Sequence, residues 1–511
     1  MLRFLIRNKG GTDAGLFLLL FCTYAYFFQG GFSNQNSRFN LSLALAMEHT
    51  VRVDSFQHNT VDKAFYNGHY YTEKAPGASY FALPVAWIGS QFIDTEDIIA
   101  EPWIGNILLY WATVFSVSIL SCGAAVCFRR LLCELNPSLS VRNAAILTLL
   151  VFAGSTVLPY ATVLFGHQVA ASLLVIGVYF GLIAARREDA GEAVRYACCS
   201  VLAFSLAVFS EYPVAVPIMI IAGALFLCAR HKTSLLKAAP IALLPAAALL
   251  VHNWVSFDNP FALGYGKLQG SQFEAGMSRG FFGVASPSLE SAWQLLFGPY
   301  RGLFIYSPVL VAACAAFFYW PRRLAKTVGS AFICGALALL IVNSSYMFWQ
   351  GGTCFGPRHL VPAIPLIATG LAYLPEAWFR HPVLWILAAV SAAINFIGTS
   401  TTLFVSEFNT SPLTTSYYKF VKSGKISITP LDYITPFTDS FERFAHVRRY
   451  KFSSWNVGEL IGLHGWWSLL PLVAVWACFV LFSVSILPRF RDQKIPNAEA
   501  RKIGSAESDS Q

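Results

Sequence analysis

Charged side chains are scarce in this sequence of 511 residues. Asp, Glu, Lys and Arg make up 12% of the chain, whereas a soluble protein of this kind carries about 25%. Hydrophobic residues make up 56%, and the mean hydropathy is +0.54. This balance excludes an ordinary soluble domain and predicts a protein whose outer surface faces lipid.

Familiar catalytic and metal-binding motifs are missing as well. The chain has no Walker-type phosphate loop, no HExxH, no CxxC and no GxSxG. Eleven cysteines are present, but only Cys354 falls in an expected outer loop, so no disulfide framework can form on the oxidising side. The pattern predicts no metal site; a divalent metal is compatible with the chemistry below but is not required by it.

What the sequence does contain is a series of apolar runs, each near the length of about 20 residues that crosses a bilayer core. Ala14–Gly30 is one of them, and it lacks a small-residue cleavage site of the signal-peptide type, so we interpret it as the first span. The twelve expected spans are 14–30, 103–127, 143–158, 167–185, 196–210, 213–229, 238–256, 302–320, 327–346, 360–375, 382–404 and 466–487. The predicted fold is an all-α polytopic membrane protein.

The distribution of charge supports this topology. With the N-terminus inside, the inner segments hold 21 basic and 10 acidic residues, whereas the outer segments hold 15 basic and 17 acidic residues. Cytoplasmic loops are enriched in Lys and Arg, so the pattern places both termini in the cytoplasm. The formal net charge of +9 is therefore explained by topology and does not indicate nucleic-acid binding.

Three outer segments are long: 31–102, 257–301 and 405–465. The first contains two stretches, 36–49 and 78–92, that are typical of short helices at the membrane interface. Residues 1–404 form one predicted membrane module, followed by the outer loop 405–465 and the last span 466–487. The polar tail 488–511 is predicted to be cytoplasmic and disordered.

The densest polar cluster lies between the two interfacial stretches. A carboxylate here, such as Asp54 or Asp62, can act as a general base. Lys74, before an Ala-Pro-Gly turn, is a candidate for binding phosphate. Glu73 and His69 are further candidates, and the alternative for each residue is a solvated interfacial loop anchored by tyrosines.

Other outer loops add single ionisable residues. Glu211 closes a very short connection at the membrane boundary, where a charge is costly and often functional. His167 lies at the tip of another loop. Arg301 and Arg358 are flanked by glycines at the outer edge, and a planar guanidinium suits a lipid phosphate. The alternatives are a capping Glu and ordinary head-group contact by the arginines.

The segments Asp62–Pro84 (DKAFYNGHYYTEKAPGASYFALP) and Gly356–Pro365 (GPRHLVPAIP) resemble membrane glycosyltransferases of the GT-C superfamily, of the protein O-mannosyltransferase and aminoarabinose-transferase type. The architectural resemblance covers roughly residues 1–400. It implies transfer of a sugar from a polyprenyl-phosphate carrier to a lipid, glycan or protein acceptor on the outer face, with inversion at the anomeric carbon.

Lys74-Ala75-Pro76 matches the Lys-Pro-Pro turn of that superfamily, so the resemblance implies that Lys74, with Arg301 and Arg358, stabilises the leaving phosphate. The sequence departs from the superfamily at 34–38, where an acidic residue is usual and Asn-Gln-Asn-Ser-Arg is found. If the activity is kept, the resemblance implies that the base is elsewhere, and we take Asp62 first and Asp54 second. A transporter or flippase for a lipid-linked or anionic solute, and a non-catalytic membrane scaffold, are the alternative functions. Compact loops favour a bacterial inner membrane.

Overall fold

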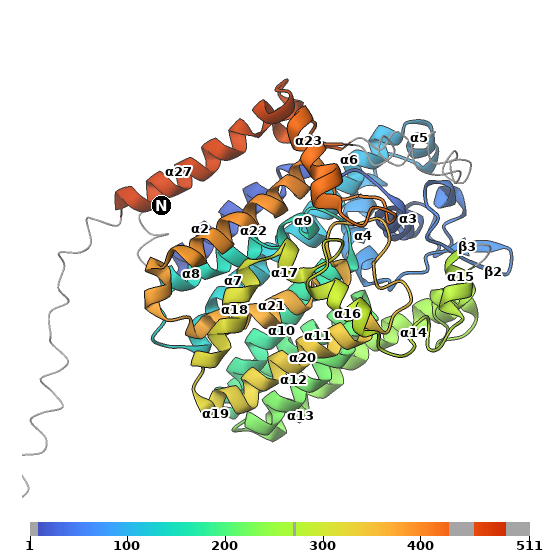
Figure 1. The fold of residues 1–511 in the computed structure, drawn as a ribbon. Coiled ribbons are helices and arrows are strands. Elements are labelled where there is room, and N and C mark those ends of the chain that lie inside the picture. Colours follow the sequence, from blue (N-terminus) through green and yellow to red (C-terminus); the bar gives the residue numbers. More distant parts are fainter. Residues whose placement is uncertain (1–8, 269–271, 429–453, 487–511) are drawn as a thin grey trace, which may run out of the picture.

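Membrane-type helices dominate the computed structural model, which describes residues 9–268, 272–428 and 454–486 (Figure 1). In chain order these helices are α2 (Lys9–Tyr24), α6 (Pro102–Thr113), α7 (Ile119–Leu135), α8 (Val141–Phe152), α10 (Gly166–Arg186), α11 (Ala190–Ser210), α12 (Ala215–Cys228), α13 (Lys232–Ala238), α14 (Leu243–Phe257), α18 (Val309–Ala316), α20 (Ser330–Ser344), α21 (Ala363–Ala368), α22 (Pro382–Thr401) and α27 (Leu470–Ile486). The predicted all-α class is confirmed.

Twelve apolar helical segments in the described ranges correspond in order to the twelve expected spans. Six have at least 18 residues and the composition of a membrane span: Trp103–Leu135, Gly166–Arg186, Ala190–Ser210, Lys232–Phe257, Arg322–Ser344 and Pro382–Thr401. Six are shorter: Gly11–Tyr24, Val141–Phe152, Tyr212–Cys228, Val309–Tyr319, Ala363–Tyr373 and Gly465–Leu481. The predicted cytoplasmic tail 488–511 lies outside the described residues, and the boundary at 404 stays a prediction.

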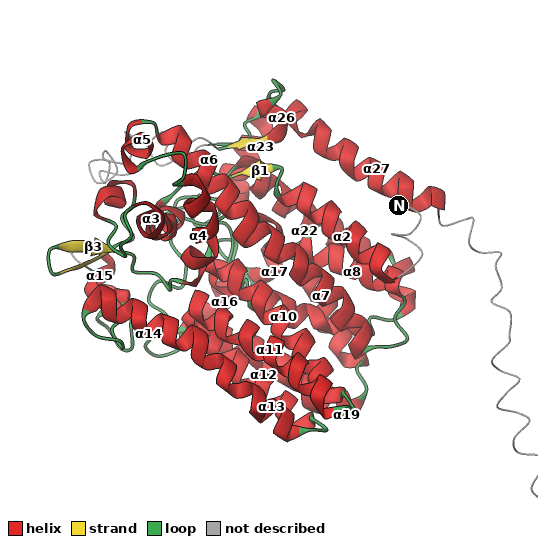
Figure 2. Ribbon diagram, turned by 180° about the vertical axis from the view of Figure 1, so that it is seen from behind, coloured by secondary structure: helices red, strands yellow, loops and turns green. Residues whose placement is uncertain are grey.

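Smaller elements gather at one end of this bundle (Figures 1 and 2). They are α3 (Ser33–Met47), η1 (Asp54–Asn59), β2 (Ala64–Tyr66), β3 (His69–Tyr71), α4 (Gly77–Gly89), α5 (Thr95–Ala100), η5 (Gly264–Lys267), α15 (Gln272–Met277), α16 (Leu289–Leu296), α17 (Leu303–Tyr306), η8 (Arg358–Leu360), α23 (Tyr418–Ser423) and α26 (Val457–Leu460). Because the long outer segments contribute most of them, we refer to this end as the outer end.

A tight hairpin and two helices organise the first outer segment. Asn67 and Gly68 both have positive φ angles, +48° and +83°, which is the geometry of a two-residue turn of type I′ between β2 and β3. After β3 the chain passes into α4, which packs against α3. The expected interfacial helices 36–49 and 78–92 therefore exist as α3 and α4.

Helix α3 is more enclosed than an amphipathic surface helix. Thirteen of its 15 residues are buried, and the first turns consist mainly of polar side chains. Buried polar groups need hydrogen-bond partners. The partners of α3 come mainly from the outer segment that follows it, and Arg38 also reaches Glu211.

Helix α2 ends at Tyr24, so the end of the expected span 14–30 is not helical and instead forms a short strand pair with the outer segment 405–465. In β1 (Phe27–Phe28) and β4 (Trp455–Asn456), Phe27 pairs with Asn456 and Phe28 with Trp455 in antiparallel register. Ser454 adds a hydrogen bond of 2.9 Å to the carbonyl oxygen of Gln29. This pairing joins the outer end of α2 to the segment that leads into α27.

Candidate functional site

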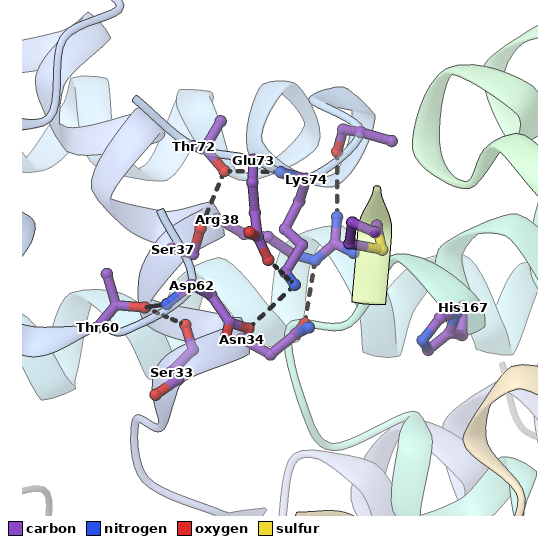
Figure 3. A network of polar contacts seen from close by, with 12 residues as sticks. Ser33, Asn34, Ser37, Arg38, Thr60, Asp62, Thr72, Glu73, Lys74 and His167 are labelled. Atoms are coloured by element: carbon purple, nitrogen blue, oxygen red, sulfur yellow. Dashed lines mark hydrogen bonds and ion pairs between the residues drawn. The ribbon is translucent and has the colours of Figure 1, made fainter. Parts of the chain in front are cut away.

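Lys74 lies in the segment between β3 and α4, with its ammonium group enclosed by carboxylates. Its Nζ atom is 3.1 Å from Asp62 Oδ2 and also contacts Glu73 Oε1. The three side chains are between 8 and 16% exposed. Figure 3 shows the ammonium between the two carboxylates, beside the polar start of α3. Asp62 and Lys74, which are twelve positions apart in the sequence, thus contact each other in the structure.

Burial and mutual attraction shift the pKa values in this group. Burial raises the pKa of Glu73 above its ordinary value, against the opposing effect of Lys74. Burial would lower the pKa of Lys74, but the charges of Asp62 and Glu73 raise it above its ordinary value. Lys74 is therefore held firmly as a cation, whereas burial favours the protonated form of Glu73.

Arg38 supplies a second buried cation from α3. It is 1% exposed, and it donates hydrogen bonds to Asn34 Oδ1 at 3.2 Å and to the carbonyl oxygen of Ala75 at 3.1 Å. A third bond, 2.7 Å long, connects it to Glu211 Oε1, from the connection between α11 and α12. Through Ala75, Arg38 also fixes the backbone directly after Lys74.

Side chains from two other helices contact Glu211. Besides Arg38, His167 at the start of α10 places Nδ1 at 3.3 Å from Oε1 of Glu211. Burial raises the pKa of Glu211, and the charges of Arg38, Lys74 and Arg358 oppose that increase. The close approach depends on Gly166, because a Cβ atom there would collide with Glu211 Oε1 and come within 3.0 Å of Arg38.

Arg358 and His359 approach from the loop between α20 and α21. The Arg358 guanidinium lies 5.5 Å from the ring centre of Phe165, and the His359 ring lies 4.9 Å from the His167 ring. Among the described residues, Arg358 Nε and His359 Nε2 are buried and have no hydrogen-bond partner. Burial of the ring, together with the positive charges of Arg358 and Lys74, holds the pKa of His359 well below its ordinary value.

These groups form one assembly, which we call the outer charged cluster. Its members are Arg38, Asp62, Glu73, Lys74, His167, Glu211, Arg358 and His359. It unites three cationic and three carboxylate side chains with two histidines, His167 and His359. The cluster is close to neutral, and an anion that enters it must compete with carboxylates already present.

Arg301, which the sequence predicts as a phosphate ligand, has a different environment. It is 0% exposed and donates to the carbonyl oxygens of Gln350, Gly352 and Cys354 at 2.8, 2.7 and 2.5 Å. Its remaining contact is the hydroxyl of Tyr300 at 3.3 Å. The guanidinium therefore organises the loop that leads to Arg358, and its phosphate-binding role stays a prediction.

Asp54 and His69 also lie apart from the contacts of Lys74. Asp54 Oδ2 is 2.8 Å from His69 Nδ1, and Oδ1 accepts a 2.7 Å hydrogen bond from the backbone of Tyr70. Both side chains are more than a third exposed. These contacts attach η1 to the hairpin, which is a structural task for this pair.

The residues that hold the cluster together include three that the sequence did not single out: Arg38, Gly166 and His359. Arg38 lies where the superfamily resemblance led us to look for an acid, but its partner Glu211 is 173 positions away. No local pattern indicates such a contact. Within the described ranges, no group of three or more His, Cys, Asp or Glu side chains is arranged to hold a metal ion.

Comparison with known proteins gives structural neighbours and no sequence relatives. No family model matches the chain, and no curated protein matches it. The structure of ArnT from Cupriavidus metallidurans bound to undecaprenyl phosphate is 13% identical, with a TM-score of 0.46, over 86% of this chain and 72% of ArnT. Archaeal oligosaccharyltransferase AglB from Archaeoglobus fulgidus, in complex with an inhibitory peptide and a dolichol-phosphate, is 14% identical, with a TM-score of 0.49, over 84% of this chain and 61% of AglB.

Proposed function

We propose that this chain is an integral membrane glycosyltransferase that moves a sugar from a polyprenyl-phosphate carrier to an acceptor on the outer face. The observation that carries the proposal is the buried Lys74 ammonium, held between Asp62 and Glu73 at the outer end of an apolar helical bundle. Sugar transfer from a lipid phosphate needs a cation for the leaving group and a base for the acceptor hydroxyl. Lys74 and Asp62 supply both within contact distance.

The leaving phosphate is bound by Lys74 and Arg358. Arg358 has a buried Nε hydrogen without a protein acceptor among the described residues, which leaves it able to donate to a phosphate oxygen. Its planar fork suits the tetrahedral group, whereas Lys74 acts as a point charge. Arg301 takes an indirect part in this proposal, because its hydrogen bonds fix the loop that carries Arg358.

Asp62 is the base, and donor binding prepares it. Its carboxylate is 3.1 Å from the Lys74 ammonium. A phosphate that attracts Lys74 weakens this ion pair and leaves the Asp62 oxygen free to accept the proton of the acceptor hydroxyl. That hydroxyl oxygen attacks the anomeric carbon from the face opposite the phosphate, the carbon–oxygen bond to the phosphate breaks, and the configuration inverts.

The proposed setting is the bacterial inner membrane, with both termini in the cytoplasm and the cluster on the opposite side. The acceptor is a lipid, a glycan or a protein, and the carrier belongs to the class of polyprenyl phosphates named with ArnT and AglB. Surrounding membrane lipids complete the environment of the twelve apolar helical segments.

Matched carboxylate variants test the assignment. We expect Asp62→Asn to lower sugar transfer by about 10²–10⁴-fold, because it removes the base. Asp54→Asn is the control, since Asp54 contacts His69 and Tyr70 in place of Lys74. The measurement is transfer of radiolabelled sugar from a panel of undecaprenyl-phosphate sugars in proteoliposomes that contain the full chain.

Three results would contradict the proposal. Full transfer by Asp62→Asn would remove Asp62 from the mechanism, and a large loss in Asp54→Asn alone would move the base to that residue. Passage of the labelled lipid across the bilayer without formation of a product would favour the transporter or flippase in place of the transferase.

A further inference from the structure

Apart from the outer charged cluster, a pocket lies on the side of α3 that faces α5 and α6. It encloses about 500 Å³, open space at its mouth included. Its lining comes from α3, η1, α5 and α6, and includes the carboxamides of Asn36, Asn40, Asn59 and Asn106. Apolar side chains complete it, among them Phe39. None of the lining side chains is charged, in contrast to the outer charged cluster.

The chemistry of this lining selects an uncharged ligand that carries hydroxyl groups. A carboxamide offers both donors and acceptors without a net charge, which suits hydroxyls. An anionic group would be enclosed here without a counter-charge, and such burial is unfavourable. Apolar lining beside the amides suits the carbon face of a sugar ring, so the pocket has the two kinds of surface that a carbohydrate presents.

Some hydrogen-bonding groups of the asparagine side chains already have protein partners, and others do not. Asn40 and Asn59 hydrogen-bond each other in both directions, at 2.8 and 3.2 Å, and Asn36 Nδ2 donates to the carbonyl oxygen of Asn59 at 2.8 Å. In the part of the chain that the structure describes, Asn36 Oδ1 and one amide hydrogen each of Asn36 and Asn59 have no hydrogen bond. These atoms are held in place and remain available to a ligand.

Helix α3 and the segment 59–62 contribute residues to both the pocket and the outer charged cluster. Asn36 and Asn40 face the pocket, whereas Asn34 and Arg38, on the opposite face of α3, take part in the cluster. Asn59 lines the pocket, and Asp62 follows three residues later, a reach of at most about 11 Å. Thr60 fixes this link by bonds to the Ser33 carbonyl and the Asp62 amide, 2.7 and 3.0 Å long (Figure 3).

The other wall of the pocket belongs to a helix with the length and composition of a membrane span. Helix α6, which begins a membrane span, lines the pocket with Gly105 and Leu109 and exposes Trp103 and Ile107 by 58 and 43% on a neighbouring face. A ligand with an apolar tail can therefore extend from the pocket along α6 into the bilayer.

We infer that this pocket binds the uncharged, hydroxyl-rich head group of a membrane glycolipid and presents one of its hydroxyls to Asp62. The role as acceptor rests on the proposed function, but binding itself does not. The substrate class follows from the amide and apolar lining, the absence of charged side chains in that lining, and the exposed apolar residues of α6 at its edge.

A glycine in the wall allows a clean test. A Cβ atom at Gly105 would meet only Ile98 Cγ2 at 3.4 Å, so Gly105→Leu can fill the pocket without a backbone clash. Gly123→Leu is the matched control, because a Cβ there meets nothing within 4 Å on the same helical run. Asn36→Ala is a second pocket variant that removes free amide groups and keeps the cavity open.

The full chain is placed in nanodiscs with equal amounts of monogalactosyl diacylglycerol and phosphatidylglycerol, and retained lipids are counted by native mass spectrometry. We expect the wild type and Gly123→Leu to retain the galactolipid preferentially. Gly105→Leu and Asn36→Ala should reduce its retention at least tenfold and about fivefold. Equal retention of phosphatidylglycerol, or unchanged retention in both pocket variants, would overturn the inference.

Two further arms separate the possible sources of failure. Methyl β-galactoside, which has no tail, should not displace the galactolipid at equal concentration; displacement would overturn the membrane-anchored part of the inference. Lys74→Met should leave galactolipid retention unchanged. If galactolipid binds as expected while Lys74→Met still transfers sugar, the proposed function fails and the binding site stands.

Discussion

Two buried cations at the outer end, Lys74 and Arg301, have opposite kinds of partners. Lys74 contacts two carboxylates, Asp62 and Glu73, which carry charge and can exchange partners. Arg301 donates to three backbone carbonyl oxygens within one loop and to a tyrosine hydroxyl. Carbonyl partners cannot move without moving the chain, so they hold a cation permanently. Carboxylate partners can be replaced by another anion, so Lys74 is suited to a ligand and Arg301 to a scaffold.

Removing each cation should therefore have a different effect. Lys74→Met should lower sugar transfer about 10³–10⁴-fold, because the phosphate loses its central positive charge. Its folding should suffer little, since the pKa of Glu73 is already raised and the loss of Lys74 favours the neutral acid further. Transfer rates and thermal unfolding of the purified variant measure both effects. Wild-type transfer by Lys74→Met would contradict the assignment of Lys74 to the phosphate.

Arg301→Met should instead destabilise the protein by about 3 kcal/mol, because buried carbonyl groups lose charge-assisted hydrogen bonds. Transfer per folded molecule should stay within about tenfold of the wild type. Thermal unfolding in detergent and activity corrected for folded protein give the two numbers. Arg380→Met, at an exposed arginine, is the control. Unchanged stability with abolished transfer would place Arg301 at the phosphate.

Gly166→Ala sharpens the comparison by displacing a carboxylate without changing any charge. The added methyl group would collide with Glu211 Oε1 and crowd Arg38. Because Arg38 also binds the Ala75 carbonyl, the backbone next to Lys74 should shift, and we expect transfer to fall about 10–100-fold. Gly223→Ala, where a Cβ meets nothing within 4 Å, should be neutral in the same transfer assay.

The smallest expected effect concerns pH. The folded-state pKa of His359 is well below that of the unfolded chain, so the unfolded state binds the extra proton first. Above about pH 6.5 the histidine is neutral in both states, and the free energy of unfolding has its full value. As the pH falls below that value, the free energy of unfolding decreases by up to about 1.4 kcal/mol per pH unit. His359→Gln should flatten the dependence of thermal unfolding on pH between 7 and 5. An unchanged slope would contradict the pKa assignment.

The positions of the apolar helices were predictable because hydropathy repeats at every span, whereas the orientation that the charges indicate stays a prediction. Each of the twelve expected spans has a helical counterpart, although the limits differ where helices continue past the apolar core, as in Trp103–Leu135. Enclosure of α3 was not predictable, since its polar residues resemble those of a surface helix until their buried partners are known.

The site was predictable only in part. A dense polar loop with a proline-containing turn indicated Asp62 and Lys74, and the structure places them in contact. Arg301 and Arg358 looked alike in sequence, because a glycine-flanked arginine reads the same whether carbonyls or a ligand will bind it. Arg38 had no signal, because it meets Glu211 through tertiary packing alone.

The strand pair β1–β4 has a consequence for biosynthesis. Phe27 and Phe28 emerge with the first span, but their partners Asn456 and Trp455 are made about 430 residues later, which at typical rates takes roughly 20 to 90 s. During that interval the backbone at the outer end of α2 must hydrogen-bond to water or to a chaperone. The outer end therefore reaches its final form only when β4 has been made and synthesis is almost complete, and a chain that stops before β4 would leave β1 unpaired.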